Sequence, residues 1–337
     1  MSIIRNIKVP TGNICVLQGE KGLIEFLSIG DYGKNQNIKA DFLGIPKEIN
    51  GVPNGEIMPL SEKWVITIST QYGCSMGCKF CDVPKVGYGK NATINDLNNQ
   101  LIEGLKLHPE IKKTKRLNLH YARMGEPTFN HSIISHAVNL KETIFPYVGN
   151  SLIHPVISTM MPKNNKYLIP FLRSWLDIKN YEFKGDAGLQ LSINSTDEKQ
   201  REQMFSGNAL SLYEISKITE TFETPYGRKY ALNFALADEY IIDAEKLATL
   251  FSPNKFMVKL TPLHKTKSCE ENSITTTNGY EAFTPYKKVE NELKKVGFDV
   301  IVFVPSYDED LGLITCGNAI LSGSIPKVEH TELIKQI

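Results

Sequence analysis

Residues 68–81 read Ile68-Ser-Thr-Gln-Tyr-Gly-Cys-Ser-Met-Gly-Cys-Lys-Phe-Cys81, and this stretch decides how the rest of the chain is interpreted. It places Cys74, Cys78 and Cys81 in a C-x3-C-x2-C spacing. Cysteine thiolates hold iron–sulfur clusters, and three of them leave one iron of a [4Fe–4S] cluster open to another ligand. The spacing therefore predicts a [4Fe–4S] cluster on these three cysteines.

Two other uses of clustered cysteines fit less well. A structural zinc site needs four ligands in a closed tetrahedron, and the nearest candidate for a fourth is His120, far along the chain. A disulfide framework is unsuitable because three adjacent cysteines cannot all pair, and a chain of 337 residues is not a small secreted scaffold.

The composition is that of an ordinary globular protein, with 41% hydrophobic and 22% charged residues. The formal net charge is +1, so any contact with nucleic acid requires a local basic patch. The first residues lack the apolar run of a signal peptide, and no stretch approaches the roughly 20 apolar residues of a membrane span. Six cysteines, three of them in one motif, suit a reducing compartment. We therefore expect a cytoplasmic protein without membrane contact.

Strand-like and helix-like segments alternate after about residue 60. The strand-like runs are residues 64–70, 117–122, 152–160, 188–194, 230–236, 256–262 and 300–304. The amphipathic stretches between them are residues 93–107, 132–144, 167–178, 209–222, 243–251 and 280–296. This alternation predicts βα units with a parallel sheet, arranged like an α/β barrel with its chemistry at the carboxyl ends of the strands. Thr93 and Asp96 predict a helix start with a capping box.

Residues 1–60 have a different pattern. Short hydrophobic runs at residues 14–17 and 23–28 are broken by glycines, which indicates a small β-rich extension. We expect three parts: this extension (residues 1–60), the α/β part (residues 61–320) and a C-terminal tail (residues 321–337).

Four motifs in sequence order give a family resemblance. A C-x3-C-x2-C motif after the first strand of a βα barrel resembles the radical S-adenosylmethionine superfamily. The segment after the cysteines resembles the one in RlmN/Cfr-type 23S rRNA adenine methyltransferases. Three later segments are similar to that family's M-G-E-P-x-x-N, S-L-H-A-P-N-D-x-x-R and C-G-Q motifs: Met124-Gly-Glu-Pro-Thr-Phe-Asn130, Leu191-Ser-Ile-Asn-Ser-Thr-Asp-Glu-Lys-Gln-Arg201 and Cys316-Gly-Asn.

The resemblance implies a partial (β/α)6 barrel that binds S-adenosylmethionine at the open iron. Glu126 would accept charge-assisted hydrogen bonds from the ligand ammonium, and Gly125 would let the backbone approach closely. Ser192, at a strand end, would reach a ribose. His264 stands where the family has an asparagine near the ligand, and a surface histidine is an equal interpretation there.

Cys316 corresponds to the cysteine that carries a methyl group on sulfur in this family. A 5′-deoxyadenosyl radical abstracts hydrogen from that methyl, and the carbon radical adds to an sp2 carbon of adenine. The resemblance thus implies an RNA substrate, rRNA or tRNA, and an electron donor such as flavodoxin or ferredoxin. The alternative for Cys316 is a buried structural cysteine, since free cysteines are commonly buried.

The chain also departs from the family pattern. The family has a further cysteine seven residues before the first cluster cysteine, where this chain has Thr67, and a histidine where it has Asn194. That cysteine resolves the protein–RNA adduct, and threonine cannot undergo thiol–disulfide exchange. Cys15 or Cys269 would have to replace it, although both fit inert thiols better.

Two rival functions therefore stay open. One is a radical enzyme of the same fold that acts on another nucleotide or a peptide, and the other is a non-catalytic iron–sulfur or RNA-binding protein. Phosphate contacts for an RNA substrate would come from Lys85, Lys90, Lys265 and Lys267. The barrel arrangement places these lysines near the carboxyl ends of the strands, where active sites of such barrels lie.

Overall fold

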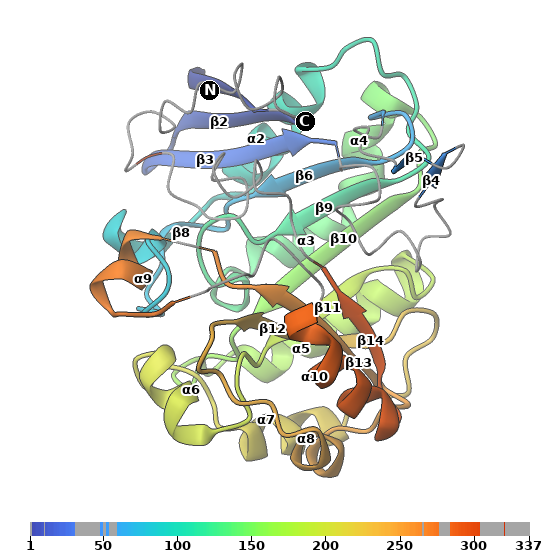
Figure 1. The fold of residues 1–337 in the computed structure, drawn as a ribbon. Helices are drawn as coiled ribbons and strands as arrows, with labels where there is room; N and C mark the ends of the chain where they lie inside the picture. Colours follow the sequence, from blue (N-terminus) through green and yellow to red (C-terminus); the bar gives the residue numbers. More distant parts are fainter. Residues whose placement is uncertain are drawn as a thin grey trace.

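A computed structural model describes residues 2–9, 11–30, 48–49, 52–53, 59–264, 266–275, 284–303 and 320. The main feature is one ten-stranded mixed sheet, in the order β1-β2-β3-β6-β9-β10-β11-β12-β13-β14 (Figure 1). Its parallel part has seven strands: β6 (Trp64–Ile68), β9 (Leu117–Tyr121), β10 (Ile153–Thr159), β11 (Gly188–Ser192), β12 (Tyr230–Leu236), β13 (Phe256–Pro262) and β14 (Asp299–Val302). The predicted mixed α/β fold with a parallel sheet is thus confirmed.

The predicted β-rich N-terminal segment joins this same sheet. Three antiparallel strands, β1 (Ile3–Val9), β2 (Gly12–Gly19) and β3 (Gly22–Ile29), extend it, and β3 pairs antiparallel with β6 in the register Leu27–Thr67. Figure 1 shows β2 and β3 in blue at one side of the sheet and β13 and β14 at the other. The sheet therefore runs without a break across the expected boundary at residue 60.

The helices connect successive parallel strands, as βα units require. They are α2 (Ile94–Lys106), α3 (Ser132–Val138), α4 (Leu140–Val148), α5 (Leu168–Asp177), α6 (Glu198–Met204), α7 (Leu212–Glu220), α8 (Ala244–Leu250), α9 (Lys267–Glu271) and α10 (Thr284–Lys295). Short turns add the 3-10 segments η1 (Val83–Lys85) and η2 (Pro127–Phe129) and the π-helical η3 (Ile178–Glu182). None of the described helices is long and apolar enough to cross a bilayer.

Local sequence explains where two of these helices begin and end. The predicted capping box of α2 is present: Thr93 Oγ1 accepts from Asp96 N, and Asp96 Oδ2 accepts from Thr93 N. The single helix expected over residues 132–144 is instead two helices. Asn139 separates them, with its side-chain amide donating to Ser135 O, because asparagine competes for backbone hydrogen bonds.

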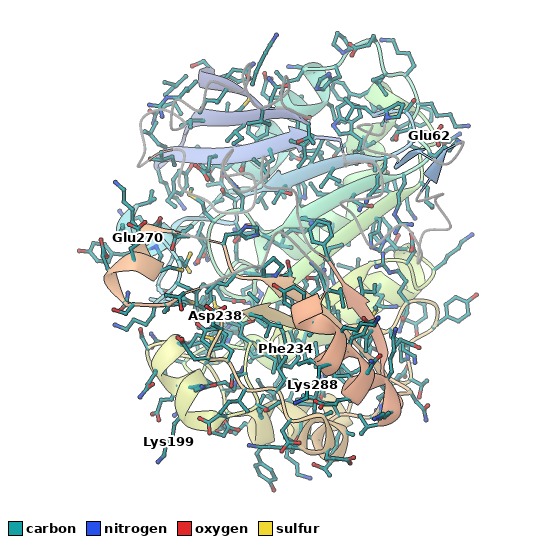
Figure 2. All side chains as sticks on the ribbon, viewed as in Figure 1. Glu62, Lys199, Phe234, Asp238, Glu270 and Lys288 are labelled. Atoms are coloured by element: carbon teal, nitrogen blue, oxygen red, sulfur yellow. The ribbon has the colours of Figure 1, made fainter. Side chains whose placement is uncertain are left out.

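The two faces of the sheet bury side chains differently. In β12, alternate residues are fully buried, whereas the residues between them are half-buried. The main core fills the fully buried face and contains Trp64, Tyr121, Trp175 and Phe234, the last of which is labelled in Figure 2. A smaller cluster on β2 and β3 includes Val16 and Leu27, with Val65 and Ile320 packed against it.

Two small hairpins complete the described structure. One pairs β7 (Gln71–Gly73) with β8 (Tyr88–Asn91), directly around the cysteine motif. The other pairs β4 (Glu48–Ile49) with β5 (Val52–Pro53). The β7–β8 hairpin matters for the site because its two strands begin and end the segment that carries the three cysteines.

Candidate functional site

The three motif cysteines lie on one loop at the carboxyl end of β6. Cys74 is 7% exposed and Cys78 is 6% exposed, while Cys81 is half-buried. Cys81 N donates to Cys78 O at 3.1 Å, and Gly77 between them has a φ of +64°. The left-handed glycine turns the loop back on itself, so the three thiols share one region.

A polar turn after α6 holds the first half of the cysteine loop. Ser206 Oγ donates to Gly77 O at 2.6 Å, and Asn208 Nδ2 donates to Met76 O at 2.9 Å. Lys79 N donates to Met204 O at 2.9 Å. These bonds satisfy loop backbone groups that a buried segment could not leave unpaired.

The short helix α9 holds the second half of the loop, a contact that no sequence pattern indicates. Asp82 Oδ1 accepts from Ser268 N at 2.9 Å and from Ser268 Oγ at 2.7 Å. Thr266 Oγ1 donates to Phe80 O at 2.8 Å, and Ser268 Oγ lies 3.0 Å from Cys81 O. These residues are nearly 190 positions away from the loop, so only the folded structure connects them to it.

Gly125 and Glu126 form a turn beside the cysteine loop, as the motif predicts. Gly125 has a φ of +93°, and a Cβ there would lie only 2.5 Å from Gln71 Cβ and 2.8 Å from Gln71 N. Only glycine fits this close approach without strain. Gln71 Oε1 accepts from Glu126 N at 2.9 Å, which fixes the turn against β7.

The carboxylate of Glu126 is fully buried and points toward β10. Its Oε2 accepts from Met160 N at 2.9 Å, and its Oε1 accepts from Thr128 N and Thr128 Oγ1 at 3.1 and 2.7 Å. The Met160 sulfur in turn contacts Cys78 Sγ at 2.9 Å. Burial raises the pKa of Glu126, and these hydrogen bonds act in the opposite direction. A single residue, Met160, therefore connects Glu126 to the cysteine loop: its backbone N–H donates to Glu126 and its sulfur contacts Cys78.

The electrostatics of the thiols follow from their burial. Burial raises the pKa of Cys74 and of Cys81 to about 12 and the pKa of Cys78 well above its usual value. Charges on Cys81 and Cys74 would raise the pKa of Cys78 further, so the three sulfurs are electrostatically coupled. A cationic metal centre would stabilise the thiolate form of such buried thiols.

The donor set consists of three cysteine thiols, the type of ligand that holds iron–sulfur clusters. In the part of the chain that the structure describes, no three His, Cys, Asp or Glu side chains could hold one metal ion. His120, considered as a fourth zinc ligand, lines a different cavity together with Arg116, His154 and Arg228. Cys74, Cys78 and Cys81 are the residues that would hold a [4Fe–4S] cluster.

Other residues named from the sequence lie at different distances from this loop. Ser192 ends β11, half-buried, and its carbonyl accepts from Arg201 at 3.3 Å. His264 follows β13, and its carbonyl contacts Cys269 Sγ at 3.5 Å. Cys316 and Lys265 lie outside the described residues.

The structure also describes Thr67, which replaces the family's further cysteine, and the two cysteines considered as substitutes for it. Thr67 is half-buried in β6 and pairs with His120 of β9. Cys15 is buried, with its Sγ 3.6 Å from Asn6 Oδ1, and burial raises the pKa of its thiol to about 12. Cys269 is buried in α9, 3.6 Å from Phe80 O, near the cysteine loop.

Of the lysines considered for phosphate contacts, Lys85 forms ion pairs with Asp82 at 3.2 Å and Glu271 at 2.9 Å. Lys90 lies on β8 and Lys267 begins α9. Lys85 thus helps to bind α9 to the cysteine loop, in addition to any contact with a substrate.

Comparison with known sequences confirms the resemblance. No protein-family model matches the chain. A protein named probable dual-specificity RNA methyltransferase RlmN from Thermotoga neapolitana is 28% identical over 206 residues, which cover 59% of this chain and 54% of that protein. A protein with the same name from Pseudothermotoga lettingae is 27% identical over 237 residues, covering 66% and 64%. The chain therefore spans about half to just under two thirds of the lengths of these relatives.

Comparison with solved structures supports the fold. A radical SAM methyltransferase from Sphaerobacter thermophilus superposes with a TM-score of 0.60 at 17% sequence identity. The match covers 94% of this chain and 79% of that one. At this identity the similarity shows a shared fold.

Proposed function

We propose that this chain is a radical S-adenosylmethionine enzyme that methylates an sp2 carbon of adenine in RNA. The observation that carries the proposal is the buried C-x3-C-x2-C loop at the carboxyl end of the first parallel strand, with Glu126 beside it. Relatives named RNA methyltransferases support the reaction class. We further propose that the parallel strands form the partial (β/α)6 barrel of this type of enzyme, and that the protein works in the cytoplasm.

The residues present fit the cofactors that this reaction needs. Cys74, Cys78 and Cys81 would hold a [4Fe–4S] cluster, which when bound supplies the electron for reductive cleavage of S-adenosylmethionine; flavodoxin or ferredoxin would deliver that electron. Glu126 would accept from the ammonium group of S-adenosylmethionine. Its carboxylate already accepts from Met160 N and from the backbone and side chain of Thr128, with the Thr159 side chain as a further partner, so the ammonium would share an oxygen with one of these donors. Ser192 and His264 are proposed as further contacts with this ligand.

Cys316 is the proposed methyl carrier. Its thiolate would attack the methyl group of one S-adenosylmethionine, forming the S–CH3 bond and releasing S-adenosylhomocysteine. Ile320, four residues later, donates from its backbone to Glu25 Oε2 at 3.1 Å. The Glu25 backbone carbonyl accepts from Ser69 Oγ, just after β6. Ile320, the first described residue after Cys316 in the sequence, is therefore linked through Glu25 to the residue that follows β6.

Thr67 favours a second candidate function, a radical enzyme of the same fold acting on another nucleotide or a peptide. In the proposed RNA reaction, a thiolate must release the product from its adduct with Cys316. Thr67 offers a hydroxyl instead, and Cys15 and Cys269 are both buried thiols. A substrate whose reaction forms no such adduct would not need that thiolate.

One experiment separates these functions. The reconstituted, reduced protein is incubated with S-adenosylmethionine, and 5′-deoxyadenosine and the mass of the Cys316 peptide are measured. The proposal expects 5′-deoxyadenosine together with one added methyl group on Cys316. Cofactor cleavage without Cys316 methylation would favour the second candidate, and no cleavage would leave a non-catalytic iron–sulfur or RNA-binding protein.

A further inference from the structure

A cavity of about 400 Å³ extends along the parallel strands from their amino ends, which lie away from the cysteine loop, to residues in the middle of the strands such as His120 and Lys259. Polar residues at the starts of five neighbouring strands line it: Lys63 before β6, Arg116 before β9, His154 in β10, Asp186 before β11 and Arg228 before β12. Strands of five to seven residues separate the two ends, about 17–23 Å at 3.3 Å per residue. Cys74, Cys78, Cys81 and Glu126 are not among the described residues that line this cavity.

The lining of this cavity is strongly cationic. Among the described residues that line it, Lys63, Arg116, Arg228 and Lys259 are cations, and Asp186 is the one carboxylate. The whole chain has a net charge of only +1, so this concentration of positive charge is local. A cavity lined by one sign of charge focuses its field on a ligand of the opposite sign.

Asp186 is linked to both arginines of the cavity, to Arg116 directly and to Arg228 through His154. Asp186 Oδ1 lies 3.7 Å from Arg116 Nη2, and Asp186 Oδ2 lies 3.3 Å from His154 Nδ1. Arg228 Nη1 contacts His154 Nε2. Burial lowers the pKa of His154 to about 4, so at neutral pH the ring donates to Asp186 and accepts from Arg228. The carboxylate of Asp186 thus contacts the Arg116 guanidinium directly and the Arg228 guanidinium only through His154.

The two arginines also act on each other as like charges. Burial, with the nearby Arg116 as the next cause, lowers the pKa of Arg228 to about 10. Burial, with the charge of Arg228 as the next cause, lowers the pKa of Lys179 to about 8. A cation kept away from water without a full counter-charge costs free energy, which a bound anion would recover.

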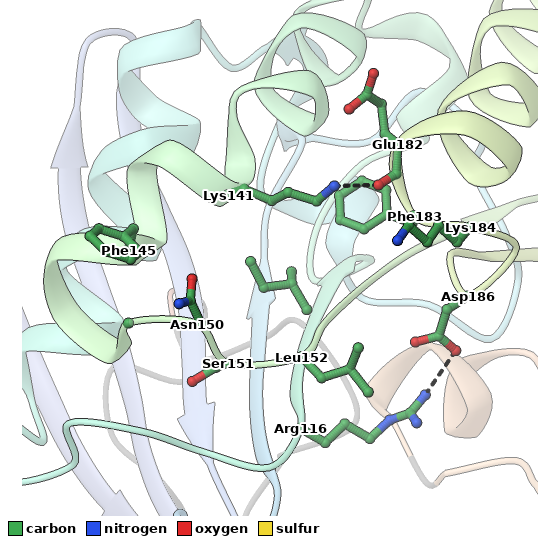
Figure 3. Close-up of a pocket in the computed structure, with 12 residues that line it drawn as sticks. Arg116, Lys141, Phe145, Asn150, Ser151, Leu152, Glu182, Phe183, Lys184 and Asp186 are labelled. Carbon is green, nitrogen blue, oxygen red and sulfur yellow. Dashed lines mark hydrogen bonds and ion pairs between the residues drawn. The ribbon is translucent and has the colours of Figure 1, made fainter.

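A neighbouring pocket is also lined by basic side chains. Figure 3 shows the Arg116–Asp186 ion pair in the wall of a neighbouring pocket of about 500 Å³. Lys141 and Lys184 also line this pocket, with Glu182 as its other acidic residue. The Arg116–Asp186 ion pair lines both spaces, so the two are neighbours.

We propose that the cavity at the amino ends of the strands binds the phosphate group of a small free molecule, through Arg116 and Arg228. Guanidinium groups present paired N–H donors that match phosphate oxygens. The volume lies within the range of about 300–1,000 Å³ typical of small-molecule sites. It suits a phosphorylated compound of about nucleotide size better than a nucleic-acid strand, which needs an open groove.

Calorimetric titration of the reconstituted full-length protein with pyrophosphate and with inorganic phosphate, in phosphate-free buffer, tests the proposal. We expect one saturable site, at least tenfold weaker in Arg228→Gln and in Arg116→Gln. Arg173→Gln, which removes an exposed arginine from α5, is the matched control and should bind like wild type. Absence of binding by wild type, or equal binding by all variants, would overturn the proposal.

Asp186→Asn keeps the test decisive if an arginine variant fails to fold. Removing the one carboxylate should tighten pyrophosphate binding at least threefold, because the cavity then holds more uncompensated positive charge. Charges that served only to join the strand ends would give no tighter binding, and that result refutes the site. Displacement of a short RNA by pyrophosphate, lost in Arg228→Gln, would show that RNA phosphates occupy the cavity and would overturn the assignment to a small molecule.

Discussion

Replacing Gly125 with alanine should destabilise the protein more than a backbone penalty alone predicts. The left-handed conformation of Gly125 costs an L-residue about 1–2 kcal/mol. The new Cβ would also overlap Gln71 Cβ, Cγ and N at 2.5, 2.7 and 2.8 Å, and overpacking of this kind adds about 1–3 kcal/mol. The expected loss of unfolding free energy is therefore about 2–5 kcal/mol.

Gly207→Ala is the matched control for this prediction. Gly207 has a φ of +72°, but nothing lies within 4 Å of the Cβ that alanine would add. The free energy of unfolding of Gly207→Ala should fall only by the backbone contribution, about 1–2 kcal/mol. Urea denaturation with linear extrapolation measures both values. If Gly125→Ala is no less stable than Gly207→Ala, the contact with Gln71 does not constrain this turn.

The same substitution should impair cofactor binding. Gln71 accepts from Glu126 N at 2.9 Å and donates to Gly89 O and Asn91 Oδ1, each at 2.8 Å. Displacing Gln71 would move the Glu126 turn away from the cysteine loop. We expect S-adenosylmethionine to bind at least tenfold more weakly to reconstituted Gly125→Ala, with little change in Gly207→Ala. Equal affinities in both variants would remove Glu126 from the proposed ligand site.

Three further predictions concern the sulfur chemistry. Alanine at any one of Cys74, Cys78 or Cys81 should abolish both the reconstituted iron absorbance and cofactor cleavage, and a triple variant that still binds about four irons per chain would refute the cluster. Cys316→Ala should keep the cluster and bind S-adenosylmethionine normally but form no methylated RNA, so normal methylation by this variant would exclude the methyl-carrier role. With an RlmN-type RNA, wild type should accumulate a crosslink through Cys316, and Thr67→Cys should raise product release; efficient turnover by wild type lacking Cys15 and Cys269 would contradict this.

The parallel strands were predictable because buried strands leave a local signal. Each of the seven was expected within a few residues of its observed bounds, since short apolar, β-branched runs mark strands covered by helices. The capping box of α2 was predictable for the same reason, as both partners lie within four residues. The helices α6 and α9 were missed because seven and five residues are too short to show helical periodicity.

The attachment of the N-terminal strands could not be read locally. The pairing of β3 with β6 joins Leu27 to Thr67, and no short-range pattern specifies a contact over that separation. The division into residues 1–60, 61–320 and 321–337 stays a prediction. The site shows the same limit. The cysteine spacing predicts the cluster ligands, which stays a prediction, whereas Asp82 and Ser268, which hold the cysteine loop, are recognisable only by their proximity in the structure.

These anchors give the cysteine loop a shape that does not depend on its sulfurs. Ser206, Asn208 and Ser268 bond to loop carbonyls, and Asp82 caps α9, so the backbone is held by oxygen and nitrogen groups. Burial raises the pKa of the three thiols and so favours their neutral form, which adds no charge to the loop in the absence of the proposed cluster. The loop is thus preorganised for its ligand, and loss of one cysteine should remove the cluster while leaving the fold intact.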